Sequence, residues 1–421
     1  MPHLLKSIVR HTILAKNNTE TILCKRQLFL LNKLCSEEDS SKKDKQESPL
    51  KRLLEDAASF NDATSTSPEQ KWATMPYPEG TEAQLQESRK QGDFFKQKNQ
   101  KDPRDSTIIL FPGQGSQYVG MTKELQKFPM VRDLFQLANY ILKYDLKKIC
   151  LEGPKSKLDE TKYAQPAIFV SSLAAIERLK EERPQGIDKC VATAGFSLGE
   201  LTALVFAGAL DFEKALKLIQ IRAEAMQRAS DMHKGGMLTV FYGPDSKLNY
   251  AVKAAKDWAI DKGDEVPECL VSNYLYPHCK VVAGSESALD YLEKNYKEYN
   301  LKKLKKLPVS GAFHSEHMQI AVEPFQRALK KIDIQDPVIS VYSNVDGKRY
   351  RNAEHIRKQL PKQIVRPVKW EQTLHSMYER NQDSYFPNTY ECGPGQSLKT
   401  ILKQVNAKAW EHCHSIEALL N

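Results

Sequence analysis

The distribution of apolar residues divides the chain at about residue 105. Residues 37–104 are charged and rich in Ser, Thr, Gln and Lys, with few β-branched residues. Their apolar content is too low to offset the entropy cost of ordering, which predicts a low-order linker with short helices near 49–58 and 82–97. Thr107–Phe111 is then a short apolar run of β-forming residues that ends in Pro-Gly, and it predicts a buried strand.

After this strand, strand-like and helix-like patterns alternate along the chain. The pattern predicts helices over 166–180, 200–207 and from about 212 to 230, and a strand over 189–194. Pro166 suits the first position of its helix, and Asp211 suits the N-cap of the long third helix. Such alternation is typical of a mainly parallel sheet covered by helices, so we expect an α/β fold.

Residues 236–303 follow a different order. The pattern predicts a strand over 237–242, a helix near 246–259, strands over 269–272 and 279–283, and a helix near 286–296. A β-α-β-β-α order is what a small ferredoxin-like insertion shows. We therefore divide the globular part into a core, residues 105–235 and 304–417, and an inserted small subdomain, residues 236–303.

Composition places the chain among ordinary globular proteins. Its 421 residues suffice for a large unit with a smaller insertion, and 41% of them are hydrophobic. No apolar stretch approaches the roughly 18 residues of a membrane span. The eight cysteines include no CxxC pair, which argues against a zinc site or a secreted disulfide scaffold and favours a reducing compartment.

The basic excess is concentrated at the N-terminus. The formal net charge is +9, but residues 1–36 contain six Lys or Arg and one acid, and the remaining 56 basic and 52 acidic groups leave only +4. Nucleic-acid binding therefore gains little support. Apolar residues such as Leu4 and Ile8 form a loosely amphipathic pattern, which together with the basic charge is typical of a mitochondrial transit peptide. A secretory signal would need a continuous apolar core, and Lys6 and Arg10 interrupt any such run. An ordinary disordered N-terminus is the alternative.

The first candidate site is the segment Gly195-Phe-Ser197-Leu-Gly199, which lies between the 189–194 strand and a helix. A serine hydroxyl is an effective nucleophile when it is exposed, close to a base and close to donors for an oxyanion. A strand-to-helix elbow exposes the hydroxyl, its glycines permit the strained turn, and the helix N-terminus supplies backbone N–H groups. Ser197 is therefore the candidate nucleophile, and a plain Gly-Ser turn is the alternative.

A Gly-rich loop, Pro112-Gly-Gln114-Gly-Ser-Gln117, follows the first strand. Its glycines let the backbone approach a ligand closely, and its position at the carboxyl end of a strand is where open α/β sheets bind ligands. The loop does not bind phosphate as a P-loop does, because no Gly-Lys-Ser/Thr follows. A plain βα turn is the alternative.

Of the ten histidines, His314 stands out because it follows a predicted strand at a Gly-Ala-Phe turn, 117 residues beyond Ser197. This position suits an imidazole that is delivered from a later strand end to deprotonate the serine. We expect His317, on a following helix, to be solvent-exposed.

Arg222 lies in the third predicted helix among apolar neighbours, near the edge of a buried face. A planar guanidinium there suits the free acid group of a substrate. The alternative is an internal salt bridge to Glu213 or Glu224.

These segments, in this order, resemble the malonyl-CoA:acyl carrier protein transacylase family, specifically its mitochondrial branch. The resemblance runs from about Thr107 to about Glu417, close to three quarters of the chain. It is carried by Phe-Pro-Gly-Gln-Gly-Ser-Gln, Gly-Phe-Ser-Leu-Gly-Glu, Ile-Arg-Ala-Glu-Ala-Met-Gln, Gly-Ala-Phe-His-Ser and Glu391-Cys-Gly-Pro-Gly395. It implies an α/β-hydrolase-like core with an inserted ferredoxin-like small subdomain.

The resemblance also implies a role for each site residue. Ser197 would be the acylated nucleophile and His314 its base, with the backbone N–H groups of Gln114 and Leu198 as the oxyanion hole. The backbone carbonyl of Gln363 would orient His314. Arg222 would bind the malonyl carboxylate.

The substrates implied by the resemblance are malonyl-CoA and the phosphopantetheine thiol of acyl carrier protein, with no bound cofactor and no metal. The location implied is the mitochondrial matrix, where the reaction would supply type II fatty acid synthesis. One departure is Phe196, which stands where bacterial members usually have His, and it leaves Ser197 and His314 unchanged.

Three other functions remain open at this point. The first is a serine hydrolase, which would normally carry an acid between nucleophile and His and an HGGG-like loop. The second is a catalytically inactive scaffold of the fatty-acid machinery. The third, the acyltransferase part of a polyketide synthase, is disfavoured because no neighbouring catalytic domain fits within 421 residues.

The N-terminal pattern yields a direct prediction. A fluorescent reporter fused behind residues 1–36 should enter mitochondria, because a basic amphipathic segment is what the import machinery recognises. Microscopy with a mitochondrial marker checks this, and a diffuse cytosolic signal would contradict it. A fusion in which Lys6, Arg10 and Lys16 are replaced by Glu should remain in the cytosol.

Overall fold

The computed structural model describes residues 102–379 and 385–417. The predicted transit peptide, residues 1–36, lies outside the described residues. So do residues 37–101 of the predicted linker, together with the short helices expected near 49–58 and 82–97. At the described N-terminal end, a short 3-10 helix, Pro103–Asp105, leads into the first strand.

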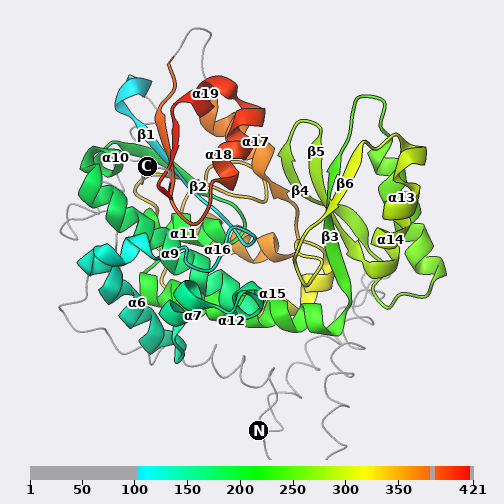
Figure 1. The fold of residues 1–421 in the computed structure, drawn as a ribbon, viewed down its shortest axis with the longest axis horizontal. Helices are drawn as coiled ribbons and strands as arrows, with labels where there is room; N and C mark the ends of the chain where they lie inside the picture. Colours follow the sequence, from blue (N-terminus) through cyan, green and yellow to red (C-terminus); the bar gives the residue numbers. More distant parts are fainter. Residues whose placement is uncertain (1–101, 380–384, 418–421) are drawn as a thin grey trace, which may run out of the picture. The chain divides into compact units, whose positions relative to one another are not determined.

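A five-stranded parallel sheet forms the centre of the larger part (Figure 1). The strands in sheet order are β10 (Cys413–Ser415), β9 (Asn388–Glu391), β1 (Thr107–Phe111), β2 (Cys190–Gly195) and β7 (Ser340–Tyr342). Every neighbouring pair is parallel. The mainly parallel α/β sheet predicted from the alternating pattern is confirmed, and β1 has the predicted bounds.

Helices cover both faces of this sheet, as the continuous burial of β1 requires. Alternate side chains of a strand point to opposite faces. Ile109 and Phe111 pack with one group of helices, and Ile108 and Leu110 pack with the other. The first group contains α6 (Pro129–Leu142), α9 (Thr161–Glu182), α11 (Leu198–Phe206), α12 (Phe212–Met232) and α15 (Gln319–Lys330), and the second α17 (Trp370–Tyr378), α18 (Ser397–Val405) and α19 (Ala407–Glu411).

Two details at helix starts differ from the sequence prediction. Pro166 is not the first residue of its helix, because α9 begins at Thr161 and the proline lies inside it. The extra turn buries the polar side chains of Thr161 and Gln165, and an apolar pattern does not reveal such positions. Asp211 does occupy the N-cap position of α12, but its side chain makes no capping bond and instead pairs with Lys214 at 3.1 Å.

A second sheet lies beside the first and carries its own helices (Figure 1). Its strands β3 (Gly235–Phe241), β4 (Cys269–Tyr276), β5 (Cys279–Ser285) and β6 (Lys303–Lys306) have the order β6-β3-β5-β4, and neighbours are antiparallel. Helices α13 (Leu248–Asp261) and α14 (Glu286–Asn295) pack on β3 and β5 through one apolar cluster. The β-α-β-β-α-β order with this pairing is the ferredoxin-like arrangement.

The small sheet extends past residue 303, where the sequence pattern placed its end. β6 continues to Lys306, and β8 (Val368–Lys369) pairs in parallel with β4. Lys369 N–H in turn donates to Asn344 O at 2.8 Å, just beyond the last residue of β7. The chain around residue 369 therefore joins the two sheets directly beside the segment that carries Ser197.

Candidate active site

Ser197 lies at the junction of β2 and α11 with φ 51° and ψ −103°, a left-handed conformation that strains any residue with a side chain. The turn is pressed against the end of β1. A Cβ atom on Gly199 would lie 2.2 Å from the Phe111 carbonyl oxygen, so only glycine fits there. This geometry is that of a nucleophile elbow, which presents the serine hydroxyl above the carboxyl edge of the sheet.

Asn344 holds the strained residue from the neighbouring strand. Its Oδ1 accepts a hydrogen bond from Ser197 N at 2.6 Å, and its Nδ2 donates to Gly195 O at 2.8 Å. The side chain is fully buried and lies two residues after the end of β7. A single amide therefore satisfies one backbone group of Ser197 and one of the residue two positions before it, which opposes relaxation of the turn.

The structure brings His314 to Ser197 and Gln363. His314 Nε2 lies 2.8 Å from Ser197 Oγ, and its Nδ1 lies 2.7 Å from Gln363 O. A carbonyl oxygen only accepts, so Nδ1 carries the proton and the Nε2 lone pair faces the serine hydroxyl. This tautomer is the one that a general base requires.

The route by which His314 reaches the site differs from the expectation. No strand immediately precedes it, because residues 307–309 are irregular and the last preceding strand, β6, ends at Lys306. His314 itself has φ 60°. The position of the His314 ring is therefore fixed by a tight turn and by its contacts with Ser197 and Gln363, and not by the end of a strand.

Burial, and secondarily the charge of Arg222, lowers the pKa of His314 to about 4, while its hydrogen bond to the Gln363 carbonyl opposes the shift. Only 3% of the residue is exposed. Because the imidazole is neutral above its pKa, it is ready to accept a proton near neutral pH.

Two backbone N–H groups remain available next to the hydroxyl. Leu198 is the first residue of α11, and Gln114 follows β1 in the Gly-rich loop. The loop lies against the elbow, since a Cβ on Gly113 would be 2.4 Å from Phe196 O. Neither N–H donates a hydrogen bond within the described part of the chain, so both can serve an oxyanion.

Arg222 reaches the same site from α12 and is almost completely buried. Its Nη1 donates to Gln165 Oε1 at 2.7 Å, and its Nη2 donates to Gln363 Oε1 at 2.9 Å and to Ser197 Oγ at 3.2 Å. These hydrogen bonds go to neutral oxygens and not to Glu213 or Glu224, the alternative partners. Among the described residues, Arg222 Nε has no hydrogen-bond partner. The guanidinium thus retains donor capacity beside the nucleophile.

Burial lowers the pKa of Arg222 to about 10, and the nearby Glu200 carboxylate opposes this shift. The group therefore stays cationic at neutral pH. A cation that is held only by neutral acceptors in a dry site attracts a carboxylate strongly.

Sequence reasoning missed three residues of this site, namely Glu200, Asn344 and Gln165. Glu200 is fully buried in the first turn of α11, where it accepts hydrogen bonds from Tyr350 and Gln363. Burial raises its pKa to about 7, and those hydrogen bonds oppose the shift. A signal was present for two of them: a carboxylate inside the apolar run Leu198–Phe206, and an asparagine shortly after a buried strand.

The expectation for His317 is wrong. The side chain is 2% exposed, and its Nε2 lies 2.9 Å from Val266 O in the small subdomain. Its element is a short 3-10 helix, Glu316–Met318, whose turn points the ring inward. Burial lowers its pKa, so the imidazole is neutral and serves packing between the two parts.

The described part of the chain offers neither a metal site nor a membrane-spanning helix. Residues 102–379 and 385–417 contain no group of three or more His, Cys, Asp or Glu side chains placed to hold a metal ion. Within the same ranges, no helix combines the length and apolar character that crossing a membrane would need.

With this geometry established, the class of protein follows from comparison with known families. Residues 108–385 match the acyl transferase domain family, which is more than half of the chain. The chain therefore belongs to the acyl transferases.

The particular branch follows from individual relatives. A Drosophila melanogaster protein named "Probable malonyl-CoA-acyl carrier protein transacylase, mitochondrial" is 60% identical over 317 residues, which cover 75% of this chain and 84% of the relative. A malonyl CoA-acyl carrier protein transacylase structure from Coxiella burnetii is similar with a TM-score of 0.66 and 31% identity over 76% of this chain and 97% of that chain. A malonyl-transacylase solved with a type II polyketide synthase acyl-carrier protein has a TM-score of 0.65 and 31% identity, and the match covers 74% of this chain and 94% of that chain. The chain belongs to the malonyl-CoA–acyl carrier protein transacylase family.

The tight elbow predicts a steep cost for one added methyl group. Gly199→Ala should destabilise the fold by about 3 kcal/mol or more, because the new Cβ meets a backbone oxygen that cannot move aside. Gly236→Ala is the matched control, since its Cβ would meet only a Leu289 methyl group at 3.4 Å. Denaturant unfolding of both variants checks the difference, and equal stability losses would contradict the packing described.

Proposed function

We propose that this chain takes a malonyl group from malonyl-CoA onto Ser197 and passes it to the phosphopantetheine thiol of acyl carrier protein. The observation that carries the proposal is the convergence of three groups. A serine hydroxyl, a neutral imidazole and a buried guanidinium meet within hydrogen-bonding distance. The first two perform acyl transfer, and the third selects an acyl group that ends in a carboxylate.

The acylation step uses the groups in order. His314 Nε2 accepts the Ser197 proton as Oγ attacks the thioester carbonyl. The oxyanion that forms accepts hydrogen bonds from Leu198 N–H and Gln114 N–H. The carbon–sulfur bond then breaks, and the departing coenzyme A sulfur takes the proton from the His314 imidazolium.

The second half reaction runs the same chemistry with another thiol. His314 deprotonates the phosphopantetheine thiol, whose sulfur attacks the malonyl ester on Ser197. The tetrahedral intermediate collapses, the carbon–oxygen bond breaks, and Ser197 Oγ regains its proton from His314. The Gln363 carbonyl holds the ring through both steps.

A neutral carbonyl in the position of a carboxylate has a consequence for this cycle. It fixes the tautomer but stabilises an imidazolium less than an anion would. The low pKa of His314 fits this arrangement. The imidazolium is therefore short-lived, and proton return to the leaving group is favoured.

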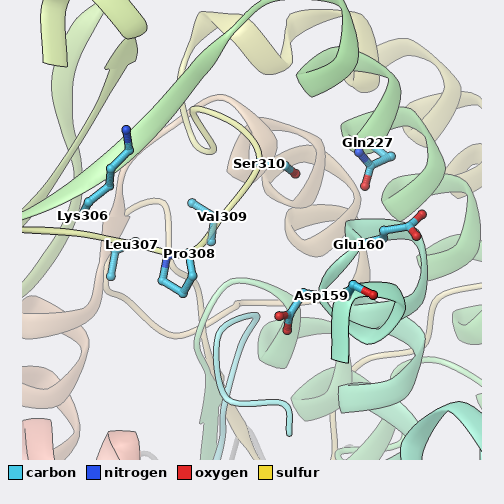
Figure 2. A pocket seen from close by; sticks show the side chains of 9 residues that line it. Asp159, Glu160, Gln227, Lys306, Leu307, Pro308, Val309 and Ser310 are labelled. Carbon is cyan, nitrogen blue, oxygen red and sulfur yellow. The ribbon is translucent and has the colours of Figure 1, made fainter. Parts of the chain in front are cut away.

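A cavity of about 570 Å³ supplies a place for the pantetheine arm (Figure 2). Lys306 and Ser310, on the segment that leads to His314, line one side, and Gln227 of α12 lines the other. Gln227 Oε1 accepts from Thr161 N, and Thr161 Oγ1 accepts from Gln114 Nε2, so hydrogen bonds link this wall to the oxyanion loop.

The charges around this cavity suit an anionic arm and an acidic carrier. The lining acids Asp159 and Glu160 are paired with Lys155 and Lys162. Lys306 lines the cavity, and the exposed lysines beside it on the edge of the small sheet extend a positive surface. Such a surface attracts phosphate groups and steers an acidic partner.

The matrix of the mitochondrion is the proposed place of action, with malonyl-loaded carrier protein feeding type II fatty acid synthesis. The Drosophila relative is named as mitochondrial. The basic, nearly acid-free composition of residues 1–36 supports the same destination.

The covalent intermediate predicts a mass change. Purified protein mixed with malonyl-CoA should gain the mass of one malonyl group, and Ser197→Ala should gain none. His314→Ala should slow acylation at least ~10²-fold, because the hydroxyl loses its base. Intact-mass spectrometry over time measures both. Normal acylation of the Ser197→Ala protein would overturn the proposed function.

The Arg222 contacts predict a change in acyl selectivity. Arg222→Ala should lower malonyl transfer by ~10²–10³-fold while acetyl transfer stays level or rises, because the carboxylate loses its partner. Arg222→Lys should rescue only part, since an ammonium cannot reproduce the planar fork. Arg327→Ala, on the surface of α15 and paired with Glu323, is the control and should change neither rate. Equal losses for malonyl and acetyl would make Arg222 a structural residue.

A further inference from the structure

One buried carboxylate accepts hydrogen bonds from two supports of the proposed site, Asn344 and Gln363. We propose that Glu200 is a positioning residue that sets the acyl selectivity of the site by fixing the Gln363 side chain against Arg222. The inference rests on the proposed function and extends it to a residue that contacts no reacting atom. Glu200 lies one turn into the helix that begins at the nucleophile.

The two oxygens of Glu200 accept three hydrogen bonds. Oε2 accepts from Gln363 Nε2 at 2.5 Å, and Oε1 accepts from Tyr350 Oη at 2.5 Å and from Asn344 N at 3.2 Å. The carboxylate is fully buried. Asn344 and Tyr350 belong to the chain after β7 and Gln363 to a later segment, so Glu200 joins α11 to two other parts of the chain.

The orientation of the Gln363 amide depends on this contact. Its Nε2 points to two acceptors, Glu200 Oε2 and Ser197 O, the latter at 2.7 Å. Its Oε1 therefore points to the Arg222 guanidinium at 2.9 Å. The reversed amide would place two donors against each other at Arg222 and two acceptors together at Glu200, so the carboxylate fixes which end faces the guanidinium.

Gln363 serves the base and the guanidinium at once. Its backbone carbonyl orients His314, while its side chain holds Arg222. Acetyl transfer needs only the oriented His314, whereas malonyl transfer needs the oriented His314 and the positioned Arg222. Displacement of the side chain therefore lowers malonyl transfer more than acetyl transfer, which a general loss of folding would not do.

Glu200→Gln is the decisive variant, because it replaces one of the two acceptor oxygens by an NH2 donor, so the side chain can no longer accept from Gln363, Tyr350 and Asn344 at once. We expect kcat/KM for malonyl-CoA to fall ~10²-fold and the malonyl-to-acetyl ratio of kcat/KM to fall ~10-fold. Glu391→Gln is the matched control. Glu391 is equally buried and accepts hydrogen bonds from Leu398 N and Lys399 N. Glu391→Gln should lower the stability of the fold and leave the malonyl-to-acetyl ratio of kcat/KM unchanged.

A double-mutant cycle tests whether Glu200 acts through Gln363. Gln363→Ala keeps the backbone carbonyl and removes the side-chain amide. If Glu200 acts through that amide, the double variant should have the same malonyl-to-acetyl ratio of kcat/KM as Gln363→Ala alone. A further ~10-fold fall in the double variant would overturn the proposal. So would an unchanged ratio in folded Glu200→Gln.

A milder variant covers a failure of Glu200→Gln to fold. Tyr350→Phe keeps the buried ring and removes one donor to Glu200, and it should lower the ratio ~3-fold. An unchanged ratio would overturn the proposal. Wild-type protein is malonylated in the same experiment, so a failed proposed function would show there as absent malonyl transfer, separately from the effect of Glu200.

Discussion

The left-handed backbone of Ser197 is the constraint on which the site depends. At φ 51° the hydroxyl stands clear of the sheet, the Leu198 N–H stays free for an oxyanion, and α11 starts immediately behind it. The fold maintains this strain from two sides. The Asn344 amide binds the backbone of Gly195 and Ser197, and the close approach of Gly199 to Phe111 O leaves the turn no room to relax. The tight packing of β1, β2 and β7 thereby holds the hydroxyl of Ser197, the proposed nucleophile, in place.

An imidazole and a guanidinium share this buried site, and among the described residues neither hydrogen-bonds directly to a carboxylate. The His314 ring is hydrogen-bonded to the Gln363 carbonyl oxygen, and Arg222 donates to the amide oxygens of Gln165 and Gln363. Glu200 does not contact Arg222 by a hydrogen bond but accepts one from the Gln363 amide. A carboxylate bound directly to Arg222 would neutralise the charge to which we assign the malonyl carboxylate under the proposed function. Placing Glu200 behind Gln363 lets it orient the guanidinium's partner while the donors beside Ser197 stay available.

Local sequence patterns predicted β1, β2, α9, α11, α12 and most of the small subdomain, but none of β7, β9 and β10 in the central sheet and not the network around the site. The β1 run and the elbow segment are contiguous, and their apolar and glycine positions have a local cause. The burial of His317, the start of α9 ahead of Pro166, and the roles of Asn344 and Glu200 depend on partners far apart along the chain. Asn344 and Ser197, for example, are separated by 147 residues. Periodicity reports which face of an element is buried, and it does not report which polar groups meet there.

A structure of the malonyl-loaded protein tests the central claim most directly. Crystals of the wild-type protein can be soaked with malonyl-CoA, in the absence of carrier protein that would remove the acyl group, and the acyl group located. The account predicts an ester on Ser197 Oγ, with the malonyl carboxylate about 3 Å from the Arg222 guanidinium and the Gln363 side chain still between Arg222 and Glu200. An acyl group on another residue, or a carboxylate that points to solvent away from Arg222, would contradict it.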